Sequence, residues 1–121
     1  MHVLTYFFLS RPLLLSWIKA SSNETQLYSR YHVDQLTHED STSFHYTAVI
    51  YLDNESHQFH GGHLQFGDGA IYTPRRGLAV IFTSGEENLH RVTPVMWGMR
   101  RALVIFLTCD KALSITSKSF L

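Results

Sequence analysis

The stretch "FHYTAVIYLD", residues 44–53, decides the fold, because it has the composition and the periodicity of a β-strand. Aromatic and β-branched residues dominate it, and these residue types favour strands. Successive side chains of a strand point to opposite faces. One face therefore carries Phe44, Tyr46, Ala48, Ile50 and Leu52, and the other carries His45, Thr47, Val49 and Tyr51. Both faces are mostly apolar, so we expect both to be covered.

Outward from this strand, the chain consists of short apolar runs separated by turn signals, a pattern typical of all-β proteins. Further strands are expected at 3–9, 26–33, 63–67, 70–74, 78–84, 89–95 and 101–109. Residues 11–20 are expected as a short helix with Pro12 in its first turn, 34–43 as a loop, and 54–62 and 96–100 as turns. With 44–53 these segments make eight strands, which suits a jelly roll, the double-stranded β-helix of cupin-like proteins.

Length and composition limit the domain organisation and the partners. The 121 residues suffice for one small domain, and 45% hydrophobic residues suffice for its core. We expect an N-terminal strand, helix and polar connection at 1–25, a core at 26–110 and a C-terminal tail at 111–121. Ten basic and ten acidic residues cancel. Nucleic acid is therefore not expected as a partner, because phosphate binding needs a basic surface.

The stretch "YHVD", residues 31–34, contains a candidate metal-binding pair. His32 and Asp34 are two positions apart and would project to the same side of a strand. Such a pair alone fits ordinary polar residues at the end of a strand equally well. His90, at the start of a later strand, offers a third ligand. Two histidines and one carboxylate on one side of a metal form the facial triad of non-haem Fe(II) oxygenases, which leaves positions open for co-substrates.

Arg100 is the candidate anchor for a 2-oxo acid co-substrate. The planar guanidinium matches the two oxygens of a carboxylate. Arg100 lies ten residues after His90, which leaves room for one turn, so both side chains can point inward. Arg101 has the opposite parity and is expected to face outward. Taken alone, Arg100 would equally fit a solvated cation at the end of a strand.

Several motifs in order resemble those of the prolyl 4-hydroxylase-type 2-oxoglutarate/Fe(II) dioxygenases. The family pattern H-x-D, a long gap and H-x3-P-V-x2-G-x-K/R is met at His32, Asp34, His90, Pro94, Val95, Gly98 and Arg100. Three further stretches resemble family segments in the same order: "YTAVIYLDN" (46–54), "FHGGHLQF" (59–66) and "TPRRGLAVIFTS" (73–84). The resemblance covers about residues 28–109.

The resemblance implies an activity and its cofactors. A dioxygenase of this family hydroxylates a C–H bond of a protein, such as that of a prolyl residue, or of another substrate, and releases succinate and CO2. It uses Fe(2+), 2-oxoglutarate, dioxygen and L-ascorbate. The metal and the catalysis would depend on His32, Asp34 and His90. Arg100, Thr47 and Tyr28 would bind the 2-oxoglutarate.

The sequence also departs from the family. Asn23 and Ser22 stand where members often have a co-substrate tyrosine, nine or ten residues before the first ligand. Only 31 residues precede His32, where members carry helices that cover the barrel, so we expect an N-terminally truncated form. A truncated, inactive metal-binding pseudo-enzyme or binding module therefore stays open as an alternative, as does a cupin-like protein that uses another divalent metal. The histidines of "HQFHGGH" (57–63) are expected in a turn rather than in a second metal site.

Two stretches, "YHVDQLT" (31–37) and "FTSGEENLHRV" (82–92), look closest to a branch of the family that is membrane-anchored in the secretory pathway. This implies an endomembrane location, and the sequons at Asn23 and Asn54 agree with it. The hydrophobic residues 1–20 are interrupted by Arg11 and Pro12, so their uncharged runs are shorter than the roughly 20 residues of a membrane span. They also lack the basic start of a signal peptide. We therefore expect them to belong to the fold rather than to form an anchor.

Overall fold

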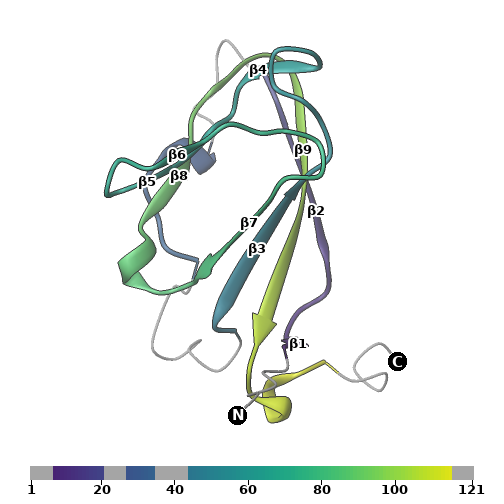
Figure 1. Ribbon diagram of the computed structural model, residues 1–121, viewed down its shortest axis with the longest axis vertical. Coiled ribbons are helices and arrows are strands. Elements are labelled where there is room, and N and C mark those ends of the chain that lie inside the picture. Colours follow the sequence, from purple (N-terminus) through teal and green to yellow (C-terminus); the bar gives the residue numbers. More distant parts are fainter. Residues whose placement is uncertain (1–6, 21–26, 35–43, 116–121) are drawn as a thin grey trace, which may run out of the picture.

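The computed structural model describes residues 7–20, 27–34 and 44–115, and within them it places nine strands in two antiparallel sheets (Figure 1). The larger sheet contains β1 (Phe8–Leu9), β2 (Leu14–Lys19), β3 (Tyr46–Tyr51), β4 (Phe59–Gly61), β7 (Ala79–Thr83) and β9 (Val95–Thr108). The smaller sheet contains β5 (Leu64–Phe66), β6 (Ile71–Tyr72) and β8 (His90–Val92). Three 3-10 turns complete the described part: η1 (Leu27–Ser29), η2 (Glu86–Asn88) and η3 (Lys111–Leu113).

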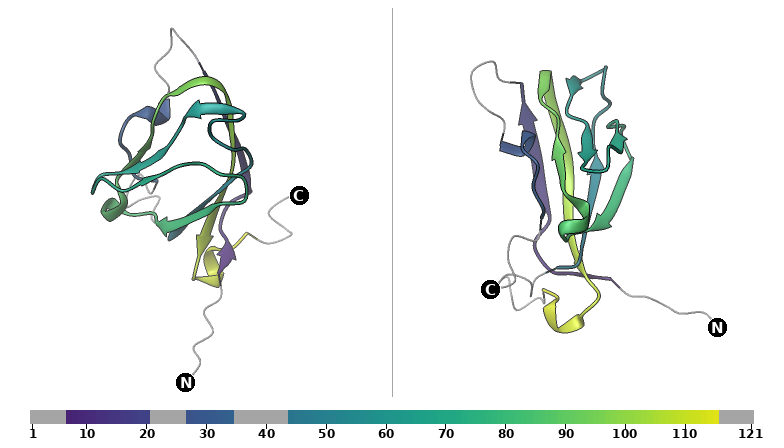
Figure 2. Two further views of the ribbon diagram at one scale, coloured as in Figure 1. Left: turned by 45° about the horizontal axis from the view of Figure 1, so that its top comes forward. Right: turned by 90° about the vertical axis from the view of Figure 1, so that its left-hand side faces the viewer.

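The strand expected at 44–53 is confirmed as β3, and it lies inside the larger sheet between β9 and β7. Its residue Val49 pairs with Val104 of β9 on one side and with Val80 of β7 on the other. The inner face of β3 packs against the smaller sheet, where Leu64 and Phe66 belong to the same buried cluster as Val49. Figure 1 and Figure 2 show the smaller sheet facing β3 and β7 of the larger sheet. The core and the functional side chains therefore lie between the sheets.

The helix expected at 11–20 is wrong, because this segment forms strand β2. A proline in the first turn is compatible with a helix, but the side chains from Leu14 onward alternate between the two faces of the sheet. Ser16 and Ile18 line the interior, whereas Trp17 is 65% exposed on the outer face. All six residues pair with β9, and this tertiary contact overrides the local helix signal.

The strand expected at 26–33 is also wrong in its described part. Residues 27–29 form the turn η1, and His32 makes only an isolated antiparallel bridge to His90. Residues 3–6 of the expected first strand, the connection at 21–25, the loop from residue 35 to 43 and the tail beyond residue 115 lie outside the described residues.

The expected turn at 96–100 is a continuous part of β9, and the expected turn at 54–62 contains β4. Gly98 permits both the continuous β9 and its pairing with β4, because it has a φ of +75° and lies directly opposite Phe59 of β4. A Cβ atom on Gly98 would lie 2.2 Å from the carbonyl oxygen of Gln58. Glycine marks a close approach of two backbones here rather than the end of a strand.

Replacement of Gly98 by alanine is expected to lower the free energy of unfolding by about 2–5 kcal/mol. The positive φ accounts for about 1–2 kcal/mol and the steric overlap for about 1–3 kcal/mol. Gly77→Ala is the matched control, because Gly77 has a φ of +83° but no atom within 4 Å of its would-be Cβ. Urea unfolding of both variants measures the difference. An equal loss of unfolding free energy in the two variants would contradict the role of the close contact between Gly98 and β4.

The outer face of the larger sheet is only partly covered, contrary to the expectation that both faces of 44–53 are buried. On β3 the outer residue Ala48 is buried and Ile50 is half-buried. Trp17 of β2 and Ile81 of β7 on the same outer face are exposed in the described part of the chain. Within that part, no helix combines the length and the hydropathy needed to span a membrane.

Candidate metal centre and co-substrate cavity

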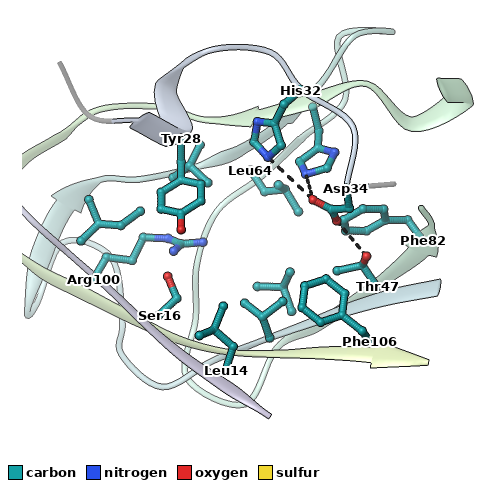
Figure 3. Close-up of a pocket in the computed structure, with 15 residues that line it drawn as sticks. Leu14, Ser16, Tyr28, His32, Asp34, Thr47, Leu64, Phe82, Arg100 and Phe106 are labelled. Carbon is teal, nitrogen blue, oxygen red and sulfur yellow. Dashed lines mark hydrogen bonds and ion pairs between the residues drawn. The ribbon is translucent and has the colours of Figure 1, made fainter. Parts of the chain in front are cut away.

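The structure brings His32, Asp34 and His90 together between the sheets (Figure 3). The backbones of the two histidines exchange hydrogen bonds, from His32 N to His90 O at 2.8 Å and from His90 N to His32 O at 2.9 Å. This pairing places the imidazole rings side by side, with centroids 4.5 Å apart. One ligand atom from each of the three residues lies within 4.8 Å of the others. The arrangement can hold a metal ion from one side.

Backbone carbonyls fix which nitrogen of each imidazole can bind a metal. His90 Nδ1 donates to the carbonyl of Asn88 at 2.7 Å, and His32 Nδ1 donates to the carbonyl of Arg30 at 2.9 Å. A carbonyl can only accept, so each Nδ1 carries the hydrogen and each Nε2 keeps its lone pair. The two Nε2 atoms face Asp34 Oδ1, at 3.4 Å from His90 and 3.8 Å from His32.

The second oxygen of Asp34 is held by a hydroxyl pair that the sequence did not fully reveal. Thr47 Oγ1 donates to Asp34 Oδ2 at 2.8 Å, and Thr47 Oγ1 and Ser84 Oγ are 2.9 Å apart. Thr47 and Ser84 are both buried. This contact turns Asp34 Oδ1 toward the imidazoles. Thr47 was expected to bind 2-oxoglutarate; it lines the cavity and contacts Asp34, and its contact with the co-substrate stays a prediction. Ser84 was not expected at the site, because a serine at the end of a strand has no distinctive signal.

The charge states suit a divalent metal. Burial alone raises the pKa of the Asp34 carboxyl, but the His90 imidazole and the Thr47 hydroxyl more than offset it and lower the pKa below its ordinary value. Burial lowers the pKa of the His90 imidazole, but the Asp34 carboxylate and the Asn88 carbonyl raise it above its ordinary value. The carboxylate is therefore ionised at neutral pH. A metal ion competes with a proton for His90, so metal affinity falls as the pH drops.

A cavity of about 180 Å³ connects the triad to Arg100. This volume is several times the roughly 30 Å³ that a water molecule occupies in the liquid. Its walls between the polar groups are apolar, and they are formed by Leu14, Ile18, Val49, Leu64, Phe82, Val92, Val104 and Phe106. Figure 3 shows Arg100, Tyr28 and Ser16 gathered at the end of the cavity remote from Thr47, with the Tyr28 hydroxyl directed toward the guanidinium.

Arg100 is a buried cation without an anionic partner among the described residues. It is 3% exposed, and burial lowers the pKa of its guanidinium. Its Nε donates to the carbonyl of Gly62 at 3.0 Å, and no carboxylate of the described chain pairs with it. Arg101 differs, because it faces outward and binds Asp53 with Nη2–Oδ1 at 2.6 Å. Buried charges are normally paired, so Arg100 provides a place for an external anion.

Tyr51 lies beside Arg100, and the sequence reasoning did not assign it to the site. Its hydroxyl is buried, and the described residues offer it no hydrogen-bond partner with ordinary geometry. The guanidinium carbon of Arg100 lies 5.1 Å from the centroid of the Tyr51 ring, and the two groups interact electrostatically. Tyr51 is therefore a neighbour of the guanidinium rather than a residue of the cavity wall. On the strand pattern alone, Tyr51 is indistinguishable from a core aromatic residue.

The cavity therefore fits a ligand with two different ends. The end at His32, Asp34 and His90 offers metal coordination, and the end at Arg100 offers binding to a carboxylate. Tyr28 lies between them, with its ring centroid 6.2 Å from that of His32. A dicarboxylic 2-oxo acid has the matching groups, because its 2-oxo acid end can chelate a metal while its other carboxylate reaches an arginine.

Comparison with known proteins agrees with this donor set. The sequence profile of the 2OG-Fe(II) oxygenase superfamily matches residues 18–108, three quarters of the chain. The chain belongs to this superfamily. The family resemblance seen in the sequence is therefore confirmed.

Curated relatives in this superfamily include 2-oxoglutarate and iron-dependent oxygenase domain-containing protein 3. The Rattus norvegicus protein is 39% identical over 108 residues, which are 85% of this chain and 33% of the relative. The Homo sapiens protein is 38% identical over 117 residues, 93% of this chain and 36% of the relative. Prolyl 3-hydroxylase 1 of Homo sapiens is 37% identical over 71 residues, 54% of this chain and 9% of the relative. The chain thus spans about a third of the length of 2-oxoglutarate and iron-dependent oxygenase domain-containing protein 3.

A solved structure supports the fold. The crystal structure of an oxidoreductase of the 2OG-Fe(II) oxygenase family from Burkholderia pseudomallei superimposes with a TM-score of 0.63 and 19% sequence identity. The match covers 88% of this chain and 47% of the other. The jelly roll expected from the strand pattern is confirmed.

Thr47→Val is expected to weaken binding of a divalent metal 10- to 100-fold, the usual cost of losing a group that orients a metal ligand. Valine keeps the volume of the side chain but frees Asp34 Oδ2 from its hydrogen bond. Titration of the protein with Mn(II), followed by the electron paramagnetic resonance of the free ion, measures the affinity. Thr73→Val, at an exposed threonine, is the control, and wild-type affinity in Thr47→Val would contradict the role of the hydroxyl.

Proposed function

We propose that this chain carries the catalytic core of an Fe(II)- and 2-oxoglutarate-dependent dioxygenase that hydroxylates a C–H bond. One observation supports this most: a His-Asp-His group and the buried Arg100, which has no carboxylate partner among the described residues, line the same cavity. Either feature alone has ordinary structural explanations. Together they match the two ends of 2-oxoglutarate.

The proposed metal ligands are His32 Nε2, His90 Nε2 and Asp34 Oδ1. Their hydrogen bonds to carbonyls and to Thr47 hold them in place before any metal binds, so little ordering is needed on binding. Iron(II), when bound there, supplies the activation of dioxygen that couples decarboxylation of 2-oxoglutarate to succinate with hydroxylation of the substrate. Protein groups supply binding, orientation and exclusion of side reactions.

The proposed co-substrate site is formed by Arg100, Tyr28 and Ser16. Arg100 binds the distal carboxylate through charge-assisted hydrogen bonds, which are stronger than neutral ones. The Tyr51 ring lies alongside the guanidinium and supports it. The apolar walls, of which Leu14, Val104 and Phe106 are part, exclude water and so strengthen these contacts.

We further propose a protein as the substrate. The similarity to prolyl 3-hydroxylase 1 supports this choice, and a prolyl residue is the first candidate. L-Ascorbate is the proposed reductant that returns oxidised iron to Fe(2+). An endomembrane location, implied by the resemblance in the sequence, stays a prediction.

The test is production of succinate from 2-oxoglutarate by the purified chain under oxygen, with iron(II) and ascorbate added. We expect slow succinate formation without a second substrate and faster formation with a prolyl-containing peptide. Metal binding without any succinate formation would instead support the binding-module alternative. Succinate formation with another divalent metal but not with iron would support the alternative of a different metal.

A further inference from the structure

A second cluster of polar side chains lies outside the cavity, around the carboxylate of Glu55. Glu55 Oε1 accepts from His60 Nδ1 at 2.6 Å and from the backbone N–H of Gly61 at 3.4 Å, and it lies 3.7 Å from His63 Nε2. Its other oxygen accepts from the Ser56 hydroxyl at 2.6 Å. The Glu55 side chain is only 10% exposed. These contacts, that of Ser56 first, lower the pKa of Glu55 to about 2, so it is a carboxylate throughout the physiological range.

The cluster does not have the geometry of a second metal site. Among the described residues, only His32, Asp34 and His90 bring three ligand atoms within 4.8 Å of one another. The Glu55 carboxylate instead holds the turn from His60 to His63.

The turn leads directly to Arg100. Gly61 has a φ of +87°, and a Cβ atom on it would lie 2.1 Å from the carbonyl oxygen of Pro94. Gly62 has a φ of +64°, and a Cβ atom on it would lie 2.7 Å from Cδ of Arg100. The carbonyl of Gly62 accepts from Arg100 Nε at 3.0 Å. The position of the turn therefore determines where the guanidinium lies.

Two groups of the described chain contact the end of the Arg100 side chain. The Gly62 carbonyl is the hydrogen-bond acceptor that the structure gives its guanidinium, and the Tyr51 ring lies alongside it. Arg101, by contrast, is fixed by two contacts of 2.9 and 2.6 Å to the Asp53 carboxylate. The orientation of the Arg100 guanidinium depends instead on the Gly62 carbonyl together with the Tyr51 ring.

We propose that Glu55 is a positioning residue for the co-substrate. It holds the Gly61-Gly62 turn, and the Gly62 carbonyl orients Arg100 toward the distal carboxylate of a dicarboxylic 2-oxo acid. The inference rests on the proposed function, in which Arg100 binds 2-oxoglutarate.

The test compares two ligands that differ in the distal carboxylate. Calorimetric titration of the Mn(II)-loaded chain with 2-oxoglutarate and with pyruvate gives the ratio of the two affinities. We expect Glu55→Ala to lower this ratio about tenfold, the change that a loss of about 1.4 kcal/mol gives, while Mn(II) and pyruvate affinities stay the same. Glu55→Gln keeps an acceptor for Gly61, so its ratio of 2-oxoglutarate to pyruvate affinity should lie between those of Glu55→Ala and the wild type. If Glu55→Ala does not fold, Glu55→Gln is compared with the wild type instead. His57→Ala, an exposed residue of the same turn, is the control.

An Arg100→Lys background separates positioning from a general structural role. There, Glu55→Ala should change the ratio by less than about twofold, because the group that it positions is gone. An unchanged ratio in Glu55→Ala, an equal weakening of both ligands, or the same change in the Arg100→Lys background would each overturn the inference. A wild-type chain that does not prefer 2-oxoglutarate over pyruvate would overturn the proposed role of Arg100 as well, so the two failures are distinguishable.

Discussion

His90→Ala is expected to abolish succinate formation and to reduce metal binding to the weak level of a two-ligand pair. His90 is the most buried member of the triad, at 4% exposure, and its Nε2 lies 3.4 Å from Asp34 Oδ1. Without it, His32 and Asp34 are a half-buried H-x-D pair that cannot hold a metal from one side with defined open positions. Succinate formation and Mn(II) titration measure the two effects.

His32→Ala is the second variant for this prediction, since the His90 ring also packs against Phe66 and Phe82 in the core. The His32 side chain is more exposed, so its removal costs less packing while it also removes a ligand. We expect the same loss of activity with a smaller change in melting temperature. Activity in either alanine variant at the wild-type level would contradict the triad, and His57→Ala serves as a histidine control outside it.

Arg100→Ala is expected to raise the 2-oxoglutarate concentration needed for half-maximal turnover about 100-fold. The loss corresponds to roughly 3 kcal/mol, the upper range for hydrogen bonds to a charged group. Arg100→Lys should lie between the wild type and alanine, because an ammonium keeps the charge but not the planar fork. Steady-state kinetics with varied 2-oxoglutarate at saturating iron measures this effect.

Arg101→Lys is the matched control for this prediction. It changes the neighbouring arginine of the same strand, which faces outward onto Asp53, and it keeps the positive charge for that carboxylate. We expect lower stability and an unchanged 2-oxoglutarate requirement. A requirement that rises equally in Arg100→Ala and Arg101→Lys would show that general damage to β9, and not the loss of an anchor, causes the effect.

The central strand and the three candidate metal ligands could be predicted because their signals are local. Residues 44–53 combine strand composition with alternation, and the strands expected at 63–67, 70–74 and 78–84 follow the same rule, so each appears in the structure. The H-x-D motif and the downstream histidine motif identify His32, Asp34 and His90 from the sequence alone. The structure then places these residues together through backbone pairing of His32 and His90.

The rest depends on contacts between segments far apart in the sequence. Residues 14–19 form a strand because β9 pairs with them, and so Ser16, read as part of a helix, was not expected in the cavity. Gly98 continues a strand because β4 pairs closely with β9 at this position. Tyr51 looks like a core residue until its ring is found beside the Arg100 guanidinium. No local pattern of residues encodes these three features.

The central claim is that one metal ion and one 2-oxoglutarate molecule meet in the cavity between His90 and Arg100. Anaerobic addition of iron(II) and 2-oxoglutarate to the chain tests it most directly, because a 2-oxo acid that chelates protein-bound iron(II) gives a visible charge-transfer absorbance. We expect this absorbance to saturate at one equivalent of each, and to be absent without iron and in His90→Ala. No absorbance in the wild-type chain at saturating iron(II) and 2-oxoglutarate, or equal absorbance in His90→Ala, would contradict the account.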